Sequence, residues 1–150
     1  MKYPNITAFL QNPWFPPGTR RETIDKYTTD AEFHRRVLAR SMSGQRLVMA
    51  FGRDFYDRIH WDNVAPTAAE QSAGITDVDH EHVERVISET DPHLIITFGK
   101  IAEEALKGRL RAEIPHYACF HPNARGRTSA ELSQFAIWVA EWVDNWRITS

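Results

Sequence analysis

The chain has 150 residues, of which 42% are hydrophobic and 25% charged, and its formal net charge is −2. These values are typical of one soluble globular domain, so we expect a single domain over residues 1–150. No run of about 18 apolar residues occurs, and the amino terminus lacks a basic segment followed by an apolar one. We therefore expect neither a membrane helix nor a signal peptide. The single cysteine, Cys119, excludes an internal disulfide and a four-cysteine iron–sulfur or zinc site.

Charge is distributed unevenly along the chain. Residues 1–60 carry ten Lys/Arg against six Asp/Glu, whereas residues 61–93 carry one arginine against eight acids. The first part can therefore form a local positive face, although arginines on helices are more often plain solvated surface. The default location of such a chain is the cytoplasm, or the nucleoid if the source is a bacterium or phage.

The first predicted element is a buried strand over residues 6–10, which runs directly into a loop over residues 11–19. Pro13 ends the strand because it cannot donate a backbone hydrogen bond, and it biases Asn12 toward extended geometry. We expect a stiff loop that holds amides and aromatic rings at the end of the strand. The loop is either the wall of a ligand site or a proline-rich turn whose aromatic side chains cap the core.

Helices are expected between this loop and the second strand. Asp30 suits the N-cap of a helix that continues to about Met42 and is broken by Ser43-Gly44. The other elements expected here are an irregular segment over 20–29, a short helix over 45–51 closed by Gly52, and a turn over 53–58.

Strands and helices alternate in the rest of the chain. The expected elements are strands over 59–64, 93–98 and 114–120, a loop over 65–78, and helices over 79–90, 100–107 and from 128 or 129 to 145 or 146. This alternation favours an α/β fold with a parallel sheet covered by helices on both faces. Trp138, Trp142 and Trp146 recur every four residues of the last helix, and we expect this stripe to pack in the core.

Ligands of open parallel sheets bind beyond the carboxyl ends of the strands. The segments at those ends are residues 11–14, 62–66, 98–100 and 121–123, which contain amides, a histidine, prolines and aromatics. The chain has no glycine-rich phosphate loop with lysine and no Gly-x-Ser-x-Gly elbow. Amides with one histidine suit the recognition of a heterocycle edge and the stabilisation of a leaving anion.

Other polar residues have less definite roles. Asp62 either orients a site residue or water or makes a hydrogen bond within its loop. His80 and His82 flank Glu81 at a spacing that places them on different helix faces, which disfavours a metal site. His34, His60, His93 and His116 show no clear partners in the sequence.

Four landmarks along the chain resemble motifs of the uracil-DNA glycosylase superfamily. Residues 11–15, Gln-Asn-Pro-Trp-Phe, are similar to its first motif, written Gly-Gln-Asp-Pro-Tyr-His in one branch and Gly-Ile-Asn-Pro-Gly in the mismatch-specific branch. The remaining landmarks are 43–47 with 61–64, 91–102, and the His-Pro pair of 120–124. They cover about residues 6–127. The first motif is closest to the mismatch-specific branch, and the single cysteine places the chain outside the iron–sulfur branches.

The resemblance implies a three-layer α/β/α sandwich with a four-stranded parallel sheet. It also implies a DNA glycosylase that hydrolyses the base–sugar bond of uracil, or a related deaminated or modified base, after flipping it out of DNA. No cofactor or metal is needed, and a monomer with DNA as its partner is expected. The roles carried over are catalytic for Asn12 and His121, substrate-binding for Gln11, Pro13, Trp14, Phe15 and Asn63, and DNA-binding for Asn123, Arg125 and Arg127.

Each role has a chemical reason within the resemblance. Asn12 would orient the attacking water, although an amide is a poor general base, and His121 would donate a hydrogen bond to a carbonyl of the leaving base. Asn63 would read the base edge, because one amide offers both a donor and an acceptor. Phe15, Tyr27 or Phe33 would stack on the base.

The chain departs from the family pattern at three places. Leu10 stands where the first motif opens with glycine, Trp14 and Phe15 replace its ending, and residues 123–127 replace the usual serine-proline-leucine loop. Two alternatives therefore remain: a catalytically weak or inactive module of the same fold that binds DNA or a nucleobase, and an unrelated α/β hydrolase or nucleoside-processing enzyme. The two arginines of the last loop would grip phosphates, enter the space left by a flipped base, or form a solvated helix entrance.

Overall fold

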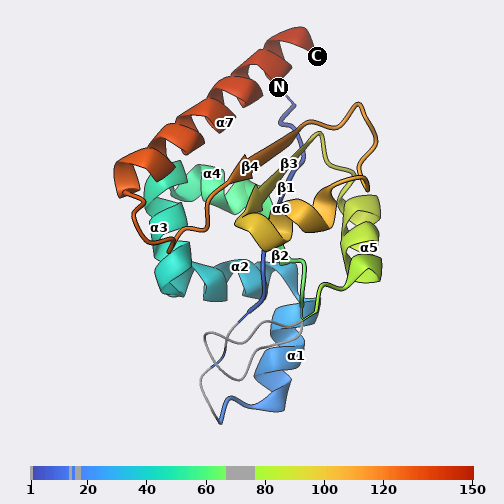
Figure 1. Cartoon of the computed structure of the whole chain (residues 1–150), viewed down its shortest axis with the longest axis vertical. Coiled ribbons are helices and arrows are strands. Elements are labelled where there is room, and N and C mark those ends of the chain that lie inside the picture. The colour runs from blue at the N-terminus through green and yellow to red at the C-terminus, as the bar shows by residue number, and fades with distance from the viewer. Residues whose placement is uncertain (1, 14, 16–17, 67–76) are drawn as a thin grey trace.

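The computed structural model describes residues 2–13, 15, 18–66 and 77–150. Four strands form one sheet: β1 (Ile6–Leu10), β2 (Ile59–Asn63), β3 (Leu94–Phe98) and β4 (His116–Cys119). All neighbouring pairs are parallel, and the order across the sheet is β2-β1-β3-β4 (Figure 1). The predicted α/β class and parallel sheet are confirmed, and each of the three later strands is shorter by one to three residues than the apolar pattern predicted.

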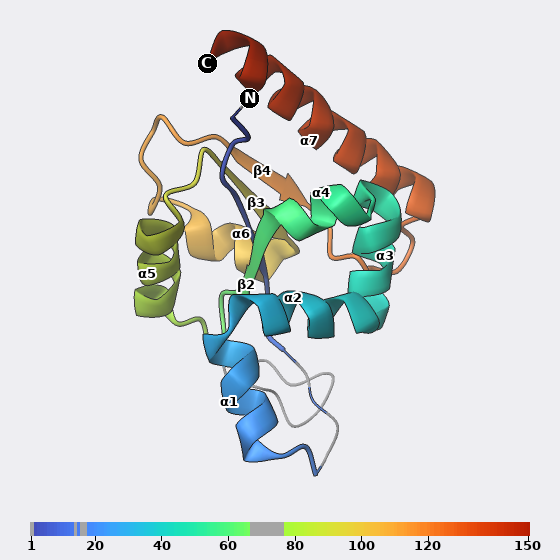
Figure 2. The same cartoon turned by 180° about the vertical axis from the view of Figure 1, so that it is seen from behind.

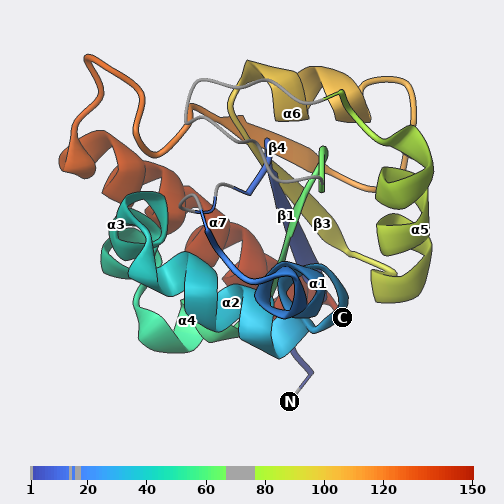
Figure 3. The same ribbon diagram turned by 90° about the horizontal axis from the view of Figure 1, so that it is seen from below.

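Seven helices are described: α1 (Arg21–Thr29), α2 (Ala31–Arg40), α3 (Met42–Phe51), α4 (Arg53–Arg58), α5 (His80–Thr90), α6 (Lys100–Leu106) and α7 (Ser129–Thr149). In the view along the sheet, α5 and α6 lie on one side and α2, α3, α4 and α7 on the other (Figure 3). The protein is therefore a three-layer α/β/α sandwich. None of the described helices is both long enough and apolar enough to cross a membrane.

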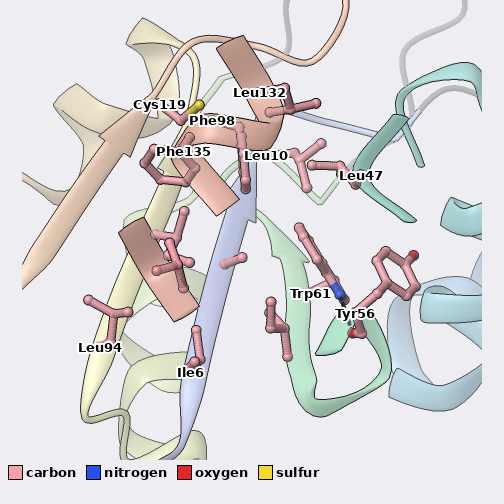
Figure 4. Packing of buried hydrophobic residues seen from close by; sticks show 14 of the residues in the cluster. Ile6, Leu10, Leu47, Tyr56, Trp61, Leu94, Phe98, Cys119, Leu132 and Phe135 are labelled. Carbon is pink, nitrogen blue, oxygen red and sulfur yellow. Dashed lines mark hydrogen bonds between the residues drawn. The ribbon is translucent and has the colours of Figure 1, made fainter. Parts of the chain in front are cut away.

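The two faces of the sheet bury different sets of side chains. Because side chains alternate along a strand, Ile6, Ala8 and Leu10 join one cluster and Phe9 joins the other. The larger cluster adds Leu47, Trp61 and Phe135, among others, from the α3 and α7 side (Figure 4). Within it, the indole N–H of Trp61 donates to the carbonyl of Tyr56 at 3.0 Å, so this large ring is buried with its polar atom satisfied. Cys119 is buried, and burial raises the pKa of its thiol to about 12.

The segment expected to be irregular over 20–29 is the helix α1, so that expectation was wrong. The segment is polar because α1 exposes most of its surface and buries only Tyr27. This one ring stacks on His34 of α2 with the ring centroids 4.1 Å apart. The polar composition of this segment did not indicate a helix, and the packing of one aromatic side chain holds the helix in place.

The break between the next two helices lies at Ser41 and not at Ser43-Gly44 as predicted. Ser41 is the N-cap of α3, and its hydroxyl accepts a hydrogen bond from the Gly44 N–H at 3.0 Å. Gly44 is buried inside the helix, where a Cβ would collide with the carbonyl oxygen of Leu38. The glycine therefore permits a close approach of the two backbones and does not end the helix.

Residues 53–58, expected to be a turn, form the short helix α4 and bury Tyr56. The final helix also differs, since it continues to Thr149, and Trp138 is 56% exposed and not in the core. Its buried face is formed by Leu132, Phe135, Ala136, Val139 and Val143. Trp138 and Trp142 each precede a buried valine, Val139 or Val143, by one position. One position turns an α-helix by about 100°, so the tryptophan stripe lies beside the buried face and not on it.

Candidate functional site

The predicted site residues lie along the carboxyl edge of the sheet. Leu10 is paired in register with Asn63, and the ladder continues with the Ala65 N–H donating to the carbonyl of Gln11 at 2.8 Å. On the other side of the sheet, the Gly99 N–H donates to the carbonyl of Cys119 at 2.8 Å. Across the edge the order is therefore Asn63, the loop after β1, Gly99 and the loop after β4 (Figure 3).

This order sets the spacing of the three central candidates. Asn63 lies on the outer strand β2, and His121 follows the other outer strand, β4, with Asn12 after β1 between them. Neighbouring strands lie about 4.8 Å apart, so the outer strands are separated by about 14 Å.

Asn12 is half-buried at the start of its loop. Its Nδ2 donates to the carbonyl of Pro13 at 3.2 Å, and no described residue bonds to its Oδ1. The local bond fixes which way the amide faces and leaves the acceptor oxygen available. An acceptor held in this way can orient a water molecule, although it cannot remove a proton as a carboxylate can.

His121 packs against Gly99 at the end of β3. Gly99 has φ +93, a left-handed backbone conformation, and a Cβ there would lie 3.6 Å from the Cβ of His121. The Nδ1 of His121 accepts from the Asn123 N–H at 3.1 Å, so the neutral ring carries its proton on Nε2. Burial lowers the pKa of His121, which favours this neutral form at pH 7. The residue is thus a neutral hydrogen-bond donor with a fixed tautomer.

The loop from Phe120 to Arg127, here called the His121 loop, is held against α3. Arg46 donates to the carbonyl of Pro122 at 2.9 Å, and the side-chain amide of Asn123 donates to the Ser43 hydroxyl at 2.7 Å. Arg127 lies over the Phe120 ring and pairs with Glu131 at 2.8 Å. Of the three residues predicted to bind DNA, only Arg125 is exposed without a bonded partner among the described residues.

Asn63, at the opposite end of the edge, is held in a buried polar cluster. It is only 4% exposed, and its side chain bonds to the Tyr27 hydroxyl, which lies 3.1 Å from Nε2 of His34. Burial raises the pKa of Tyr27 and lowers that of His34 to about 4, so both are neutral at pH 7. Tyr27 also packs edge-to-face with Phe15, with the ring centroids 5.1 Å apart.

Asp62 fixes the backbone of Asn63 from the other side. Its Oδ1 accepts from the Asn63 N–H and from Nε2 of His82, each at 2.8 Å, and Oδ2 lies 3.3 Å from Nε2 of His60. Burial would raise the pKa of this carboxyl, but the bonds from His60, His82 and the Asn63 N–H outweigh burial and hold the pKa well below its usual range. Arg85 donates to Nδ1 of His82 at 2.9 Å, which places the histidine proton on the nitrogen that faces Asp62.

We call Tyr27, His34, Asp62, Asn63 and His82 the Asn63 cluster. Sequence reasoning did not connect its members, because they come from β2 and three helices. The alternation in β2 places His60 and Asp62 on one strand face and could have paired those two. His82 is 20 residues from Asp62, and no spacing rule brings them together. Among the described residues, no group of three histidine, cysteine or acidic side chains is arranged to hold a metal ion.

The remaining predicted substrate contacts lie in the loop after β1. Gln11 and Phe15 are half-buried and Pro13 is buried, while Trp14 lies outside the described residues. The structure thus brings Asn12, Asn63 and His121 to one edge, and it holds Asn123 and Arg127 in bonds within the chain. Comparison of the sequence with models of known protein families gives no match, and neither does comparison with curated protein sequences.

Proposed function

We propose that this protein is a DNA glycosylase of the uracil-DNA glycosylase type, acting on uracil or a related deaminated or modified base flipped out of DNA. The observation that carries the proposal is the tautomer of His121. Its Nδ1 is occupied by the Asn123 N–H, so a neutral Nε2–H donor stands across the sheet edge from a buried amide, Asn63. A neutral donor stabilises negative charge that develops on a carbonyl oxygen of a departing base.

The reaction would divide between three side chains. Asn63 pairs with the edge of the flipped base, and Asn12 holds a water below the sugar carbon C1′ through its Oδ1, to which no described residue hydrogen-bonds. The bond from C1′ to the base breaks with its electron pair passing to the base, while the water oxygen bonds to C1′ and releases a proton to solvent. Solvent then returns a proton to the base anion, so the products are the C1′ hydroxyl and the neutral base. His121 stabilises the base anion through its Nε2–H.

Asp62 and Tyr27 act through Asn63 and are positioning residues. Asp62 accepts the backbone N–H of Asn63 at 2.8 Å, and Tyr27 bonds to its side chain. With the backbone and the amide both held, Asn63 would meet the base edge without first losing rotamer freedom.

The second candidate function is a module of the same fold that binds DNA or a nucleobase and cleaves nothing. One observation favours it: the carboxylate nearest the site, Asp62, is committed to His60, His82 and the Asn63 backbone. Asn12 would then be the group that orients the water, and an amide is a poor general base. This arrangement predicts slow chemistry or none.

The test is base release from oligonucleotides that carry uracil, hypoxanthine, xanthine or a 5-substituted uracil. We expect abasic sites with at least one of them, and a decrease of about 100-fold in rate for Asn12→Ala and for His121→Ala. Lys107→Gln, at the far end of α6, is the matched control and should retain the full rate.

Binding measurements separate the two functions. Tight binding of the same oligonucleotides without release of any base supports the non-catalytic module. If the protein neither binds these oligonucleotides nor releases a base from them, both proposals are contradicted. Release that persists unchanged in both site variants would show that another group performs the chemistry.

A further inference from the structure

A second candidate site lies at the amino edge of the sheet, at the end of the molecule opposite α1. Figure 2 shows the amino terminus and the carboxyl end of α7 close together at this end of the molecule. A cavity of about 480 Å³ is lined there by residues of the first segment of the chain, the α3–α4 junction and the end of α7. Strands of five residues are about 17 Å long, so this cavity is well separated from the candidate site at the carboxyl edge. Its volume falls in the range of small-molecule sites, about 300–1,000 Å³.

Aromatic rings form the apolar part of the cavity wall. Tyr3, Phe51 and Phe55 line it, and all three are half-buried, so part of each ring remains accessible. Phe55 links the other two, with centroids 6.0 Å from Tyr3 and 5.6 Å from Phe51. Tyr3 meets Phe55 edge-to-face, and Phe51 is tilted against Phe55 at 34°. Rings packed against each other in this way form a rigid platform on which a planar group can stack.

Arginines form the polar part. Arg53, Arg58 and Arg147 line the cavity, and Asp54 is the only carboxylate among its described lining residues. Arg58 lies 4.5 Å above the Tyr3 ring, and no described carboxylate pairs with it. Stacking on Tyr3 restricts the guanidinium group while leaving its N–H groups available to an anion.

The arginines of the cavity differ in how they are paired. Asp57 is the nearest partner of Arg53, at 3.4 Å, but it also pairs with Arg35 at 3.2 Å. Arg58 and Arg147 act electrostatically on the Tyr3 hydroxyl, and so does the Asp144 carboxylate from outside the lining. Arg53 thus shares its carboxylate with a second arginine, whereas Arg58 has no carboxylate partner among the described residues.

We propose that this cavity binds a phosphate attached to a planar ring, as in a nucleotide, with Arg58 holding the phosphate and Phe55 stacking on the base. A guanidinium group can donate two parallel N–H bonds to a phosphate, and stacking on Tyr3 holds the Arg58 guanidinium in place before the phosphate binds. The ring needs the aromatic platform. Free nucleotides and the end of a nucleic-acid strand share this chemistry. The proposal does not depend on base excision at the opposite edge.

The experiment titrates the full chain with AMP and follows binding by calorimetry. We expect saturable binding, at least about tenfold weaker for adenosine, which lacks the phosphate, and for inorganic phosphate, which lacks the ring. Arg58→Gln and Phe55→Leu should each weaken AMP binding by about tenfold. Arg40→Gln, an exposed arginine outside the cavity, is the matched control and should bind AMP as the unmodified chain does.

A 5′-phosphorylated oligonucleotide distinguishes the two sources of the ligand. If it displaces AMP and loses affinity in Arg58→Gln, the cavity takes the end of a strand. If it does not displace AMP, the cavity takes free nucleotides. No AMP binding at about 10 mM, or equal weakening in Arg58→Gln and Arg40→Gln, would overturn the proposal. Circular dichroism of Phe55→Leu shows whether that variant folds, and Arg58→Gln carries the test if it does not.

Discussion

The two ends of the carboxyl edge are built in contrasting ways. At the β2 end, four of the five members of the Asn63 cluster are buried and each member is bonded to another. At the β4 end, His121 is half-buried, and only its Nδ1 is bonded to a described residue. A buried polar group without a partner costs about 1–3 kcal/mol, so the first arrangement is sensitive to every one of its members. The second leaves a donor free for a ligand. The bonded, stability-sensitive groups are thus concentrated at the β2 end, and the donor available to a ligand lies at the β4 end.

Removing Asp62 should produce the largest loss of stability. Asp62→Ala leaves His82 and the Asn63 N–H without their acceptor inside the protein. We expect a decrease of about 3–5 kcal/mol in the free energy of unfolding, measured by chemical denaturation. His121→Ala should cost less than about 1 kcal/mol, because the only hydrogen bond its ring makes to a described residue is from the Asn123 N–H. Equal losses for the two variants would contradict the contrast between the ends.

The pH dependence of stability should also arise at the Asn63 cluster. Burial lowers the pKa of His34 from 6.5 to about 4, so the unfolded chain binds this proton more readily than the folded chain. Stability from this group is therefore complete above pH 6.5 and is lost as the pH falls toward 4. Between pH 6.5 and 5 the expected loss is about 2 kcal/mol, in denaturation curves measured at each pH. His34→Gln should flatten that slope, and an unchanged slope would assign the effect to other groups.

A smaller effect is expected from one hydroxyl. Tyr27→Phe keeps the ring stacked on His34 but removes the oxygen between His34 and Asn63. We expect a loss of about 1–2 kcal/mol in stability. Tyr117→Phe is the control, because its hydroxyl has no partner among the described residues and its loss should cost less than about 0.5 kcal/mol.

The same substitution tests positioning. If Tyr27 orients Asn63, Tyr27→Phe should raise KM for base release more than it lowers kcat, since the amide then meets the base less well ordered. A purely structural role would leave both constants unchanged in the folded fraction.

Local patterns predicted much of the fold. The apolar runs of β1 and β3 reflect strands that are buried on both faces, and the alternation of β2 reflects a strand that is buried on one face. Together these patterns predicted parallel strands covered by helices. Helix α1 was missed because a single ring, Tyr27, holds it in place. The helix break was predicted at Ser43-Gly44 and not at Ser41, because glycine is a typical helix breaker. Here Gly44 lies inside a helix, where it allows the backbone of α3 to contact the backbone of Leu38.

The candidate site, like the fold, could be predicted only in part from the sequence. Asn12, Asn63 and His121 were predicted to lie at one edge because each is at or just after the carboxyl end of a predicted strand, while their roles were taken from the resemblance. The hydrogen bonds that orient them were not found. His34 and His82 reach the site from helices α2 and α5, and their distances to Tyr27 and Asp62 depend on how the helices pack. Such contacts are set by the tertiary structure and leave no periodic signal in the sequence.

Gly44 has a consequence for how this protein tolerates sequence change. Every other amino acid has a Cβ, and at this position the Cβ would meet the Leu38 backbone, which cannot move aside as a flexible side chain can. Helix α3 would have to shift, and with it Ser43 and Arg46, which hold the His121 loop. In a mutational scan, position 44 should therefore accept glycine alone. Its substitutions should register as losses of function, although no atom of Gly44 would touch the substrate.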